Sequence, residues 1–432
     1  MLRSKKIASL LVLSLLPSLK SSSVHAQTTT DNVLNPVAVV PKADDAISQA
    51  RLRALALFRA LTGVPLPIDD DRLVQMEAAI SAGRERDAAK IATSDPLFYD
   101  VRVRDMARKM STRDESVRAP LSDFVATFVG VVRDSDSTSA KELLTGNFTY
   151  RGKAGLTQAN GQPVRQDLLN DFLNSNNHYN DLANPANKFS LMKVLEKSPI
   201  QKVVMSNANT VPVDHPDPAG LITTRAFMEA HAIAGTNRRL VEFSFRQFMC
   251  QPITQWADAS APDDRVGRDV DRAPGGSPNK FMVTCKACHG QMDGLRGAFA
   301  MVDFNGNQVR YQTGTNPVGK MNRNADVFPE GFQMRDNTFV NYATEGKNRD
   351  EFGWRSDLQG KGMKEFAAMI ANSQGFSRCL VRRVFSNVCK RDAGADEEGL
   401  IRAIANDFEA GNYHLRNLFE TVALRPECVG TK

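Results

Sequence analysis

The chain has 432 residues, of which 42% are hydrophobic and 24% are charged, a composition typical of globular proteins with two or three domains. The formal net charge is +6, but four of the basic residues fall in the first 26 positions, which hold no acidic residue, so the remainder carries +2. Such a small surplus leaves no basic stripe to neutralise phosphates and argues against a nucleic-acid partner.

Residues 1–26 have the features of a secretory signal peptide. A basic start is followed by a mainly apolar stretch at 7–16, and Val24-His25-Ala26 offers a small-residue cleavage site. The apolar stretch is too short to span a bilayer, which takes about 20 residues, and no later stretch suffices either. We therefore expect an exported protein without a membrane span, located in the periplasm, at the cell surface or outside the cell.

Beyond the signal peptide the sequence predicts a mainly α-helical protein. Residues 27–43 are polar, contain prolines and lack periodicity, so we expect a flexible leader. A helical N-terminal domain should occupy 44–222, beginning with a helix that Asp45 caps and that ends at Gly63. Residues 146–222 of this domain are rich in Asn, Gly and Pro and should form an irregular connector.

Two histidines, His178 and His215, fall in the connector. Because loops run over the surface, we expect both to be exposed polar residues and not metal ligands. Helical periodicity then resumes at 223–233 and 238–250, before a loop rich in Pro, Gly and Asp at 251–280.

The expected haem domain, residues 223–345, contains the motif described below. After the motif, Asn305-Gly306 lies between apolar flanks and predicts a short β-hairpin within 300–312. A C-terminal helical domain should follow at 346–432. Its first long helix carries an apolar face at a four-residue spacing, formed by Phe376, Leu380, Val384 and Val388.

The motif is Cys285-Lys286-Ala287-Cys288-His289, a C-x-x-C-H pattern that occurs once in the chain. In such a pattern each thiol adds to one vinyl group of a haem, and the adjacent imidazole binds the iron. The motif therefore predicts one covalent haem c, with Cys285 and Cys288 as attachment sites and His289 as the proximal iron ligand. A CxxC redox pair and half of a zinc site are the alternatives, and export to an oxidising compartment favours haem.

The second axial ligand decides the chemistry of such a haem, since Met raises the reduction potential and an open position permits ligand binding. Met334 is the preferred candidate because it follows a proline loop 45 residues after His289. His231, on a predicted helix, is the alternative, and Met321 is a further one. An open position is the remaining outcome.

The other four cysteines, Cys250, Cys379, Cys389 and Cys428, are disulfide candidates in an oxidising compartment. Cys379 and Cys389 lie on one predicted helix, ten residues or about 15 Å apart, which is too far for a disulfide. Two pairings remain open, in which Cys428 bonds to either Cys379 or Cys389 and Cys250 bonds to the other.

Around the motif the chain resembles a known family. The run Cys285-Lys286-Ala287-Cys288-His289-Gly290-Gln291-Met292-Asp293, followed by Asp303 and Gly306, is similar to the haem-motif domain of planctomycete-type cytochrome proteins. These are large exported bacterial proteins built from several domains of unknown function. The chain departs from the pattern in two places: the family's next Gly falls one position later, at Gly297, and its usual Glu is Ala300.

The resemblance covers residues 220–428 and, more weakly, 50–150. It implies an exported haem protein. Together with the motif, it predicts a mono-haem c-type cytochrome that transfers electrons, with a periplasmic or extracellular redox partner and the cytochrome maturation machinery as partners. A peroxidase-like or oxygenase-like haem enzyme with an open sixth position, and a binding scaffold stabilised by haem, are the alternatives; no catalytic side chain is predicted.

Overall fold

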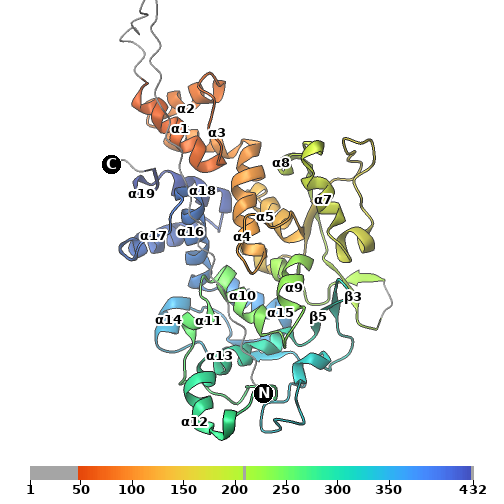
Figure 1. Cartoon of the computed structure of the whole chain (residues 1–432). Coiled ribbons are helices and arrows are strands. Elements are labelled where there is room, and N and C mark those ends of the chain that lie inside the picture. The colour runs from red at the N-terminus through yellow and green to blue at the C-terminus, as the bar shows by residue number, and fades with distance from the viewer. Residues whose placement is uncertain (1–46, 208–210, 430–432) are drawn as a thin grey trace, which may run out of the picture. The chain divides into compact units, whose positions relative to one another are not determined.

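The computed structural model describes residues 47–207 and 211–429 (Figure 1). Of the described residues, about 53% are helical and 9% form strands, which confirms the mainly α prediction. The predicted signal peptide, the leader and the cap at Asp45 lie outside the described residues. Within the described ranges, no helix has both the length and the apolar character that crossing a membrane requires.

The N-terminal helices begin and end at residues that satisfy their free backbone groups. The hydroxyl of Ser48 accepts a hydrogen bond from the backbone of Arg51 at 3.0 Å, and Gly63 ends the same helix with a φ of 82°. The elements up to residue 194 are α1 (Gln49–Thr62), α2 (Asp71–Ser81), α3 (Glu85–Thr93), the π-helix η1 (Phe98–Val103), α4 (Arg104–Ser111), α5 (Asp123–Arg133), α6 (Glu142–Thr145), the π-helix η2 (Leu168–Leu173), α7 (Asn177–Ala183), η3 (Pro185–Asn187) and α8 (Leu191–Val194).

The remaining helices surround the candidate site and close the chain. They are η4 (Gly220–Thr223), α9 (Arg225–Ala232), α10 (Arg238–Phe248), α11 (Ile253–Trp256), η5 (Pro274–Gly276), α12 (Pro278–Lys280), η6 (Phe281–Cys285), α13 (Lys286–Arg296), η7 (Gly297–Phe299), η8 (Gly319–Asn322), α14 (Lys347–Phe352), α15 (Gly362–Ala371), α16 (Gln374–Cys389), η9 (Ala395–Glu397), α17 (Glu398–Ala410), α18 (Leu415–Ala423) and α19 (Pro426–Val429).

The strands are short and form three small sheets. Two of these are antiparallel pairs: β1 (Thr149–Gly152) with β2 (Leu195–Ser198), and β7 (Thr338–Val340) with β8 (Gln359–Lys361). The third has the order β4 (Pro212–Asp214), β3 (Lys202–Met205), β6 (Gln308–Tyr311) and β5 (Val302–Asn305). Strands β5 and β6 pair antiparallel, whereas β3 and β6 pair parallel, so this sheet joins the expected connector to the residues after the motif.

One large apolar cluster extends from Ala54 in α1 to Ala423 in α18. It runs through the boundaries that the sequence suggested after residues 222 and 345, and the described residues form a single unit. Two smaller clusters lie apart from it, one around Met321 and Met334 and one around Val266 and Phe281. The second of these contacts the motif.

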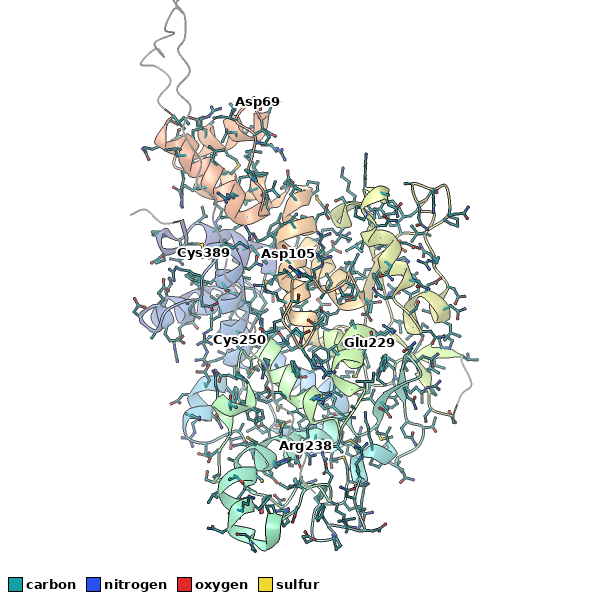
Figure 2. All side chains as sticks on the ribbon, in the orientation of Figure 1. Asp69, Asp105, Glu229, Arg238, Cys250 and Cys389 are labelled. Carbon is teal, nitrogen blue, oxygen red and sulfur yellow. A yellow bond between two sulfur atoms is a disulfide. The ribbon has the colours of Figure 1, made fainter. Side chains whose placement is uncertain are left out.

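The disulfides follow one of the two pairings left open by the sequence. Cys250 bonds to Cys379 and Cys389 bonds to Cys428 (Figure 2). Cys379 and Cys389 lie on the continuous helix α16, as the periodicity predicted. The first bond therefore fixes the end of α10 to α16, and the second fixes the C-terminal segment to the end of α16.

The expectation that His178 and His215 are exposed was wrong. His178 is fully buried, and its ring accepts a hydrogen bond from the backbone of Gly152 at 2.8 Å. The ring of His215 is also buried and accepts from the backbone of Asp217 at 3.0 Å, and burial lowers its pKa to about 3. Both imidazoles therefore serve as buried acceptors for backbone N–H groups, a role that composition does not reveal.

Candidate functional site

The motif lies on a single helical run that begins at Pro278 and continues through η6 into α13. Cys285 ends the π-helical turn and Cys288 lies in the first turn of α13. Both thiols are free and partly exposed. Burial, together with the charge of Glu242 and the neighbouring Cys285, raises the pKa of the Cys288 thiol, so this thiol is protonated at neutral pH.

Glycines on one face of α13 allow it to pack directly against backbone. A Cβ atom at Gly290 would lie 2.8 Å from the carbonyl oxygen of Pro262, and one at Gly294 would lie 2.6 Å from that of Val340. At Gly297 a Cβ would overlap the carbonyl of Thr338. Because these glycines recur at four- and three-residue intervals, they share one face, and that face fixes how α13 is placed.

The imidazole of His289 faces a buried carboxylate. Its Nδ1 lies 3.6 Å from Oδ1 of Asp293, one helical turn further on, and this nitrogen is buried without a hydrogen-bond partner. Asp293 is itself fully buried and accepts hydrogen bonds from Nε of Arg238 at 2.5 Å and from the backbone of Gly267 at 2.9 Å. Burial disfavours the charged carboxylate, but Arg238 and Arg296 outweigh it and hold the pKa of Asp293 well below its usual range.

A network of buried charges extends from Asp293. Arg238 also donates to both carboxylate oxygens of Asp269, so it bridges two carboxylates, and their charges raise its pKa against the effect of burial. Arg296 is fully buried as well, with Nη1 3.3 Å from Asp269, while its Nε and Nη2 have no partner. Burial lowers the pKa of Arg296. The negative charge beside His289 is therefore held in place by two buried guanidinium groups.

Two large apolar side chains just before the motif are exposed. Met282 and Val283, in the turn before Cys285, are 45% and 68% exposed. Cys285 packs against the small cluster of Val266, Val270 and Phe281. Exposed aliphatic side chains next to two free thiols and an inward-facing Nδ1 fit a covalently attached, flat apolar group. This donor set fits haem c, which needs two thiols and one imidazole.

Across the two described ranges, no group of three or more His, Cys, Asp or Glu side chains is placed to hold a metal ion.

Met334 lies in a small cluster with Ala300, Val318 and Met321 and is only 4% exposed. Both of its backbone polar groups bond to the side chain of Asn322 at 2.8 Å. Two residues earlier, the backbone of Phe332 donates to the carbonyl of Val266 at 2.7 Å. The structure therefore brings the segment of Met334 to the loop that covers the motif, and it places the two candidate methionines in one cluster.

His231 is fully buried in α9 between aromatic rings. Its ring stacks on Phe243 at 4.0 Å and meets Phe227 edge-on at 4.5 Å. Neither ring nitrogen has a hydrogen-bond partner, and burial, aided by the charges of Arg113 and Arg239, lowers its pKa to about 3. The residue is therefore a neutral imidazole inside an aromatic cluster.

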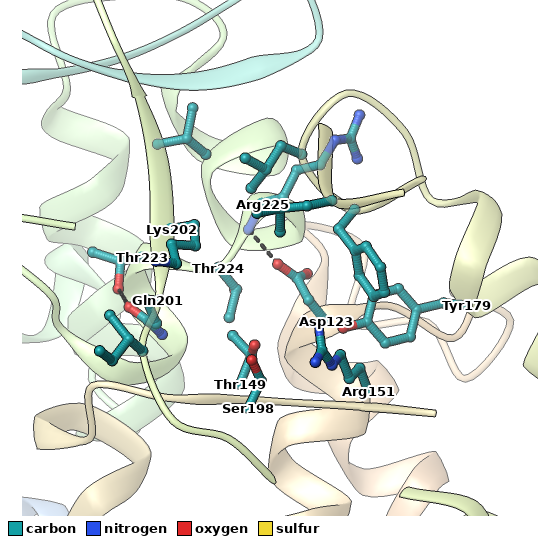
Figure 3. A pocket seen from close by; sticks show the side chains of 15 residues that line it. Asp123, Thr149, Arg151, Tyr179, Ser198, Gln201, Lys202, Thr223, Thr224 and Arg225 are labelled. Atoms are coloured by element: carbon teal, nitrogen blue, oxygen red, sulfur yellow. Dashed lines mark hydrogen bonds between the residues drawn. The ribbon is translucent and has the colours of Figure 1, made fainter. Parts of the chain in front are cut away.

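A separate small cavity lies between η2, β3 and the start of α9 (Figure 3). The carboxylate of Asp123 accepts from the backbone of Arg225 at 2.5 Å, and the hydroxyl of Thr223 donates to Gln201 at 2.6 Å. The cavity offers about 60 Å³ of water-accessible space and is not lined by the motif. The backbone hydrogen bonds from Arg225 and Ala226 to Asp123 hold the start of α9 against α5.

Comparison of the chain with family models, with curated proteins and with solved structures gave no match. The resemblance to planctomycete-type cytochrome proteins therefore stays a prediction from the motif and its flanks. The sequence identified the thiols and the imidazole, and it included Asp293 in the resembling run. It missed the pairing of Asp293 with Arg238, because 55 residues separate the two in the chain.

Proposed function

We propose that the protein is an exported mono-haem c-type cytochrome that transfers electrons. The observation that carries the proposal is the state of the six cysteines. Four are paired, and the two that are free are Cys285 and Cys288, one helical turn apart and next to His289. A chain that leaves only its C-x-x-C-H thiols unpaired keeps them available for thioether bonds to a haem.

Each residue of the site has a role in this proposal. Cys285 and Cys288 hold the haem, and His289 binds its iron through Nε2, which leaves Nδ1 facing Asp293. Ligating histidines commonly donate their second ring N–H to a carboxylate, which fixes the ring and makes it a stronger donor. The haem supplies one-electron chemistry at this surface, and a periplasmic or extracellular redox partner would dock over it.

The haem-domain boundaries 223–345 and the placement of the β5–β6 pair after the motif belong to the same proposal. The parallel pairing of β3 with β6 anchors the residues that follow α13, and it crosses the first of these boundaries, because β3 lies before residue 223. Met334 is the preferred distal ligand, since its segment reaches the loop over the motif through Phe332 and Val266.

A second candidate is a haem enzyme with an open sixth position. It is favoured by the packing of both distal candidates, because Met334 is enclosed with Met321 and His231 is enclosed by Phe227 and Phe243. If both candidate side chains stay in the core, neither binds the iron, and its sixth coordination position is open to small molecules.

Intact mass tests the proposal. The protein, purified from a host with working cytochrome maturation machinery, should exceed the mass of its mature polypeptide by one haem. The adduct should be lost in Cys285→Ala/Cys288→Ala and retained in the matched control Cys389→Ser/Cys428→Ser, which also removes two cysteines. An unmodified wild-type mass would refute the proposal.

The visible spectrum separates the two candidates. An electron carrier with Met334 as ligand should be low-spin, insensitive to cyanide and to carbon monoxide, and should become high-spin in Met334→Ala. A wild-type spectrum that is high-spin and responds to both ligands would favour the enzyme.

A further inference from the structure

A cavity of about 510 Å³ is lined by residues of α4, α10 and α16, and the motif does not line it. Helix α4 contributes Lys109, the end of α10 contributes Arg246, and α16 contributes Arg382, Arg383, Ser386 and Asn387. Cys250 also lines the cavity, and its disulfide to Cys379 fixes α10 to α16. The walls are therefore covalently held, as expected of a site that is formed before its ligand arrives.

The lining is rich in positive charge. It contains four cationic side chains and two carboxylates, Glu115 and Asp392. Arg246 and Arg382 have carboxylate partners outside the lining, at 2.7 Å and 2.8 Å. Within the described residues, Lys109 and Arg383 form no ion pair.

Arg383 has no ion-pair partner among the described residues, and the charge of Glu115 in the same lining offsets its charge only in part. Its guanidinium donates to the carbonyls of Gln247 and Arg246 at 2.8 and 2.9 Å and to the side-chain oxygen of Gln247 at 2.7 Å. All three acceptors are neutral, and burial lowers its pKa to about 10. A partly buried cation without a carboxylate at ion-pair distance is costly, and an anionic ligand would offset that cost.

A second buried arginine lies behind the same wall. Arg102 donates to the backbone carbonyl of Asn387 at 2.9 Å and to that of Arg59 at 2.8 Å, and burial lowers its pKa to about 10. Nearby, burial and the charges of Arg102 and Lys109 lower the pKa of Lys390. The cations of this region thus repel one another, and an anion in the cavity would relieve the repulsion.

The size and polarity of the cavity indicate the class of the ligand. Planar guanidinium groups match tetrahedral oxyanions with paired donors. The volume exceeds what one inorganic ion fills, and Ser386 adds a hydroxyl to the lining that can pair with a ligand hydroxyl. We infer that this cavity binds a small hydroxylated phosphate or sulfate ester, a property independent of the proposed haem.

Calorimetric titration of the purified full-length mature protein tests this inference at constant ionic strength. The probes are glucose 6-phosphate, glucose 6-sulfate and glucose. We expect one-to-one binding of at least one ester and none of glucose. Lys109→Gln should weaken binding about tenfold, the order expected for one charge-assisted contact.

Ser386→Asp is the decisive variant, because a carboxylate at this position would pair with the neighbouring arginines and exclude an anion. It should abolish binding while leaving the haem spectrum unchanged. Lys193→Gln, on the distant helix α8, removes the same charge and should bind as the wild type does. Esters that bind no better than glucose, or equal binding by Ser386→Asp and Lys193→Gln, would overturn the inference. Neither result would bear on haem attachment.

Discussion

The carboxylate of Asp293 is fully buried between a histidine and two guanidinium groups. Removing one partner of a buried ion pair leaves the other charge uncompensated, which costs more than the pair itself contributes. Asp293 therefore links the packing of the motif helix to the electronic environment of His289.

We predict that Asp293→Asn lowers the free energy of unfolding by about 3–5 kcal/mol, because Arg238 and Arg296 lose a buried counter-charge. The reduction potential of the haem should rise at the same time, since a neutral amide makes the His289 ring a weaker donor. Urea unfolding and a redox titration measure the two effects.

Asp264→Asn is the control, because the side chain of Asp264 is 62% exposed and its removal should change neither quantity. A loss of stability in Asp293→Asn with an unchanged potential would assign Asp293 a purely structural role.

His231 gives a prediction about pH. Its pKa falls from 6.5 in the unfolded chain to about 3 in the native protein. Between these values the unfolded state binds a proton that the native state does not, so stability falls as pH falls. The loss should be about 1.4 kcal/mol per pH unit from pH 6.5 downwards.

His231→Phe should reduce the slope of this part of the stability curve by about 1.4 kcal/mol per pH unit, because a Phe ring can occupy the same aromatic cluster and does not titrate, while the contribution of His215 remains. Urea unfolding of both proteins between pH 4 and pH 8 provides the comparison, and parallel curves would contradict the prediction. An unchanged visible spectrum of the variant would also exclude His231 as the distal ligand.

Among the elements, the helices were predictable and most of the strands were not. The apolar face of helix α16, its cap at Ser373 and its length are all encoded within 17 residues. The local sequence is therefore enough to predict this helix. Strands β1 to β4 have three or four residues each and include charged side chains, and they exist because distant segments pair with them. Strands β5 and β6, which pair antiparallel on either side of Asn305-Gly306, differ in that the turn signal between them is local.

The glycine face of α13 gives a prediction for a whole element. Gly294→Ala would place a Cβ 2.6 Å from the carbonyl oxygen of Val340, so either α13 or β7 must move. We expect a loss of about 1–3 kcal/mol of unfolding free energy, measured by urea denaturation.

The matched control is Gly399→Ala in α17, where a Cβ would meet nothing within 4 Å. There the better helix propensity of alanine should stabilise the protein by up to about 1 kcal/mol. If both variants changed stability alike, helix propensity and not the close approach of α13 would explain the effect.

At the scale of the whole molecule, the two disulfides should stabilise the fold to different extents. They enclose loops with sequence separations of 129 and 39 residues. Loop-closure entropy predicts about 5 kcal/mol for the first bond and about 4 kcal/mol for the second. Replacing each pair by serine should lower stability in that order, as measured by thermal unfolding of the purified variants.

Peptide mapping without reduction checks the pairing itself. It should recover Cys250 joined to Cys379 and Cys389 joined to Cys428. Recovery of Cys250 joined to Cys389 would contradict the structure and support the other pairing that the sequence left open.

The loop closed by Cys250 and Cys379 contains Cys285 and Cys288. When the chain is synthesised or exported N-terminus first, Cys250 therefore appears first and the two motif thiols follow. Its disulfide partner, Cys379, appears only later. During that interval the only thiols that Cys250 can meet are those of the motif. In the proposed cytochrome, thioether formation would remove these competitors, so the timing of haem attachment would govern how faithfully the disulfides form.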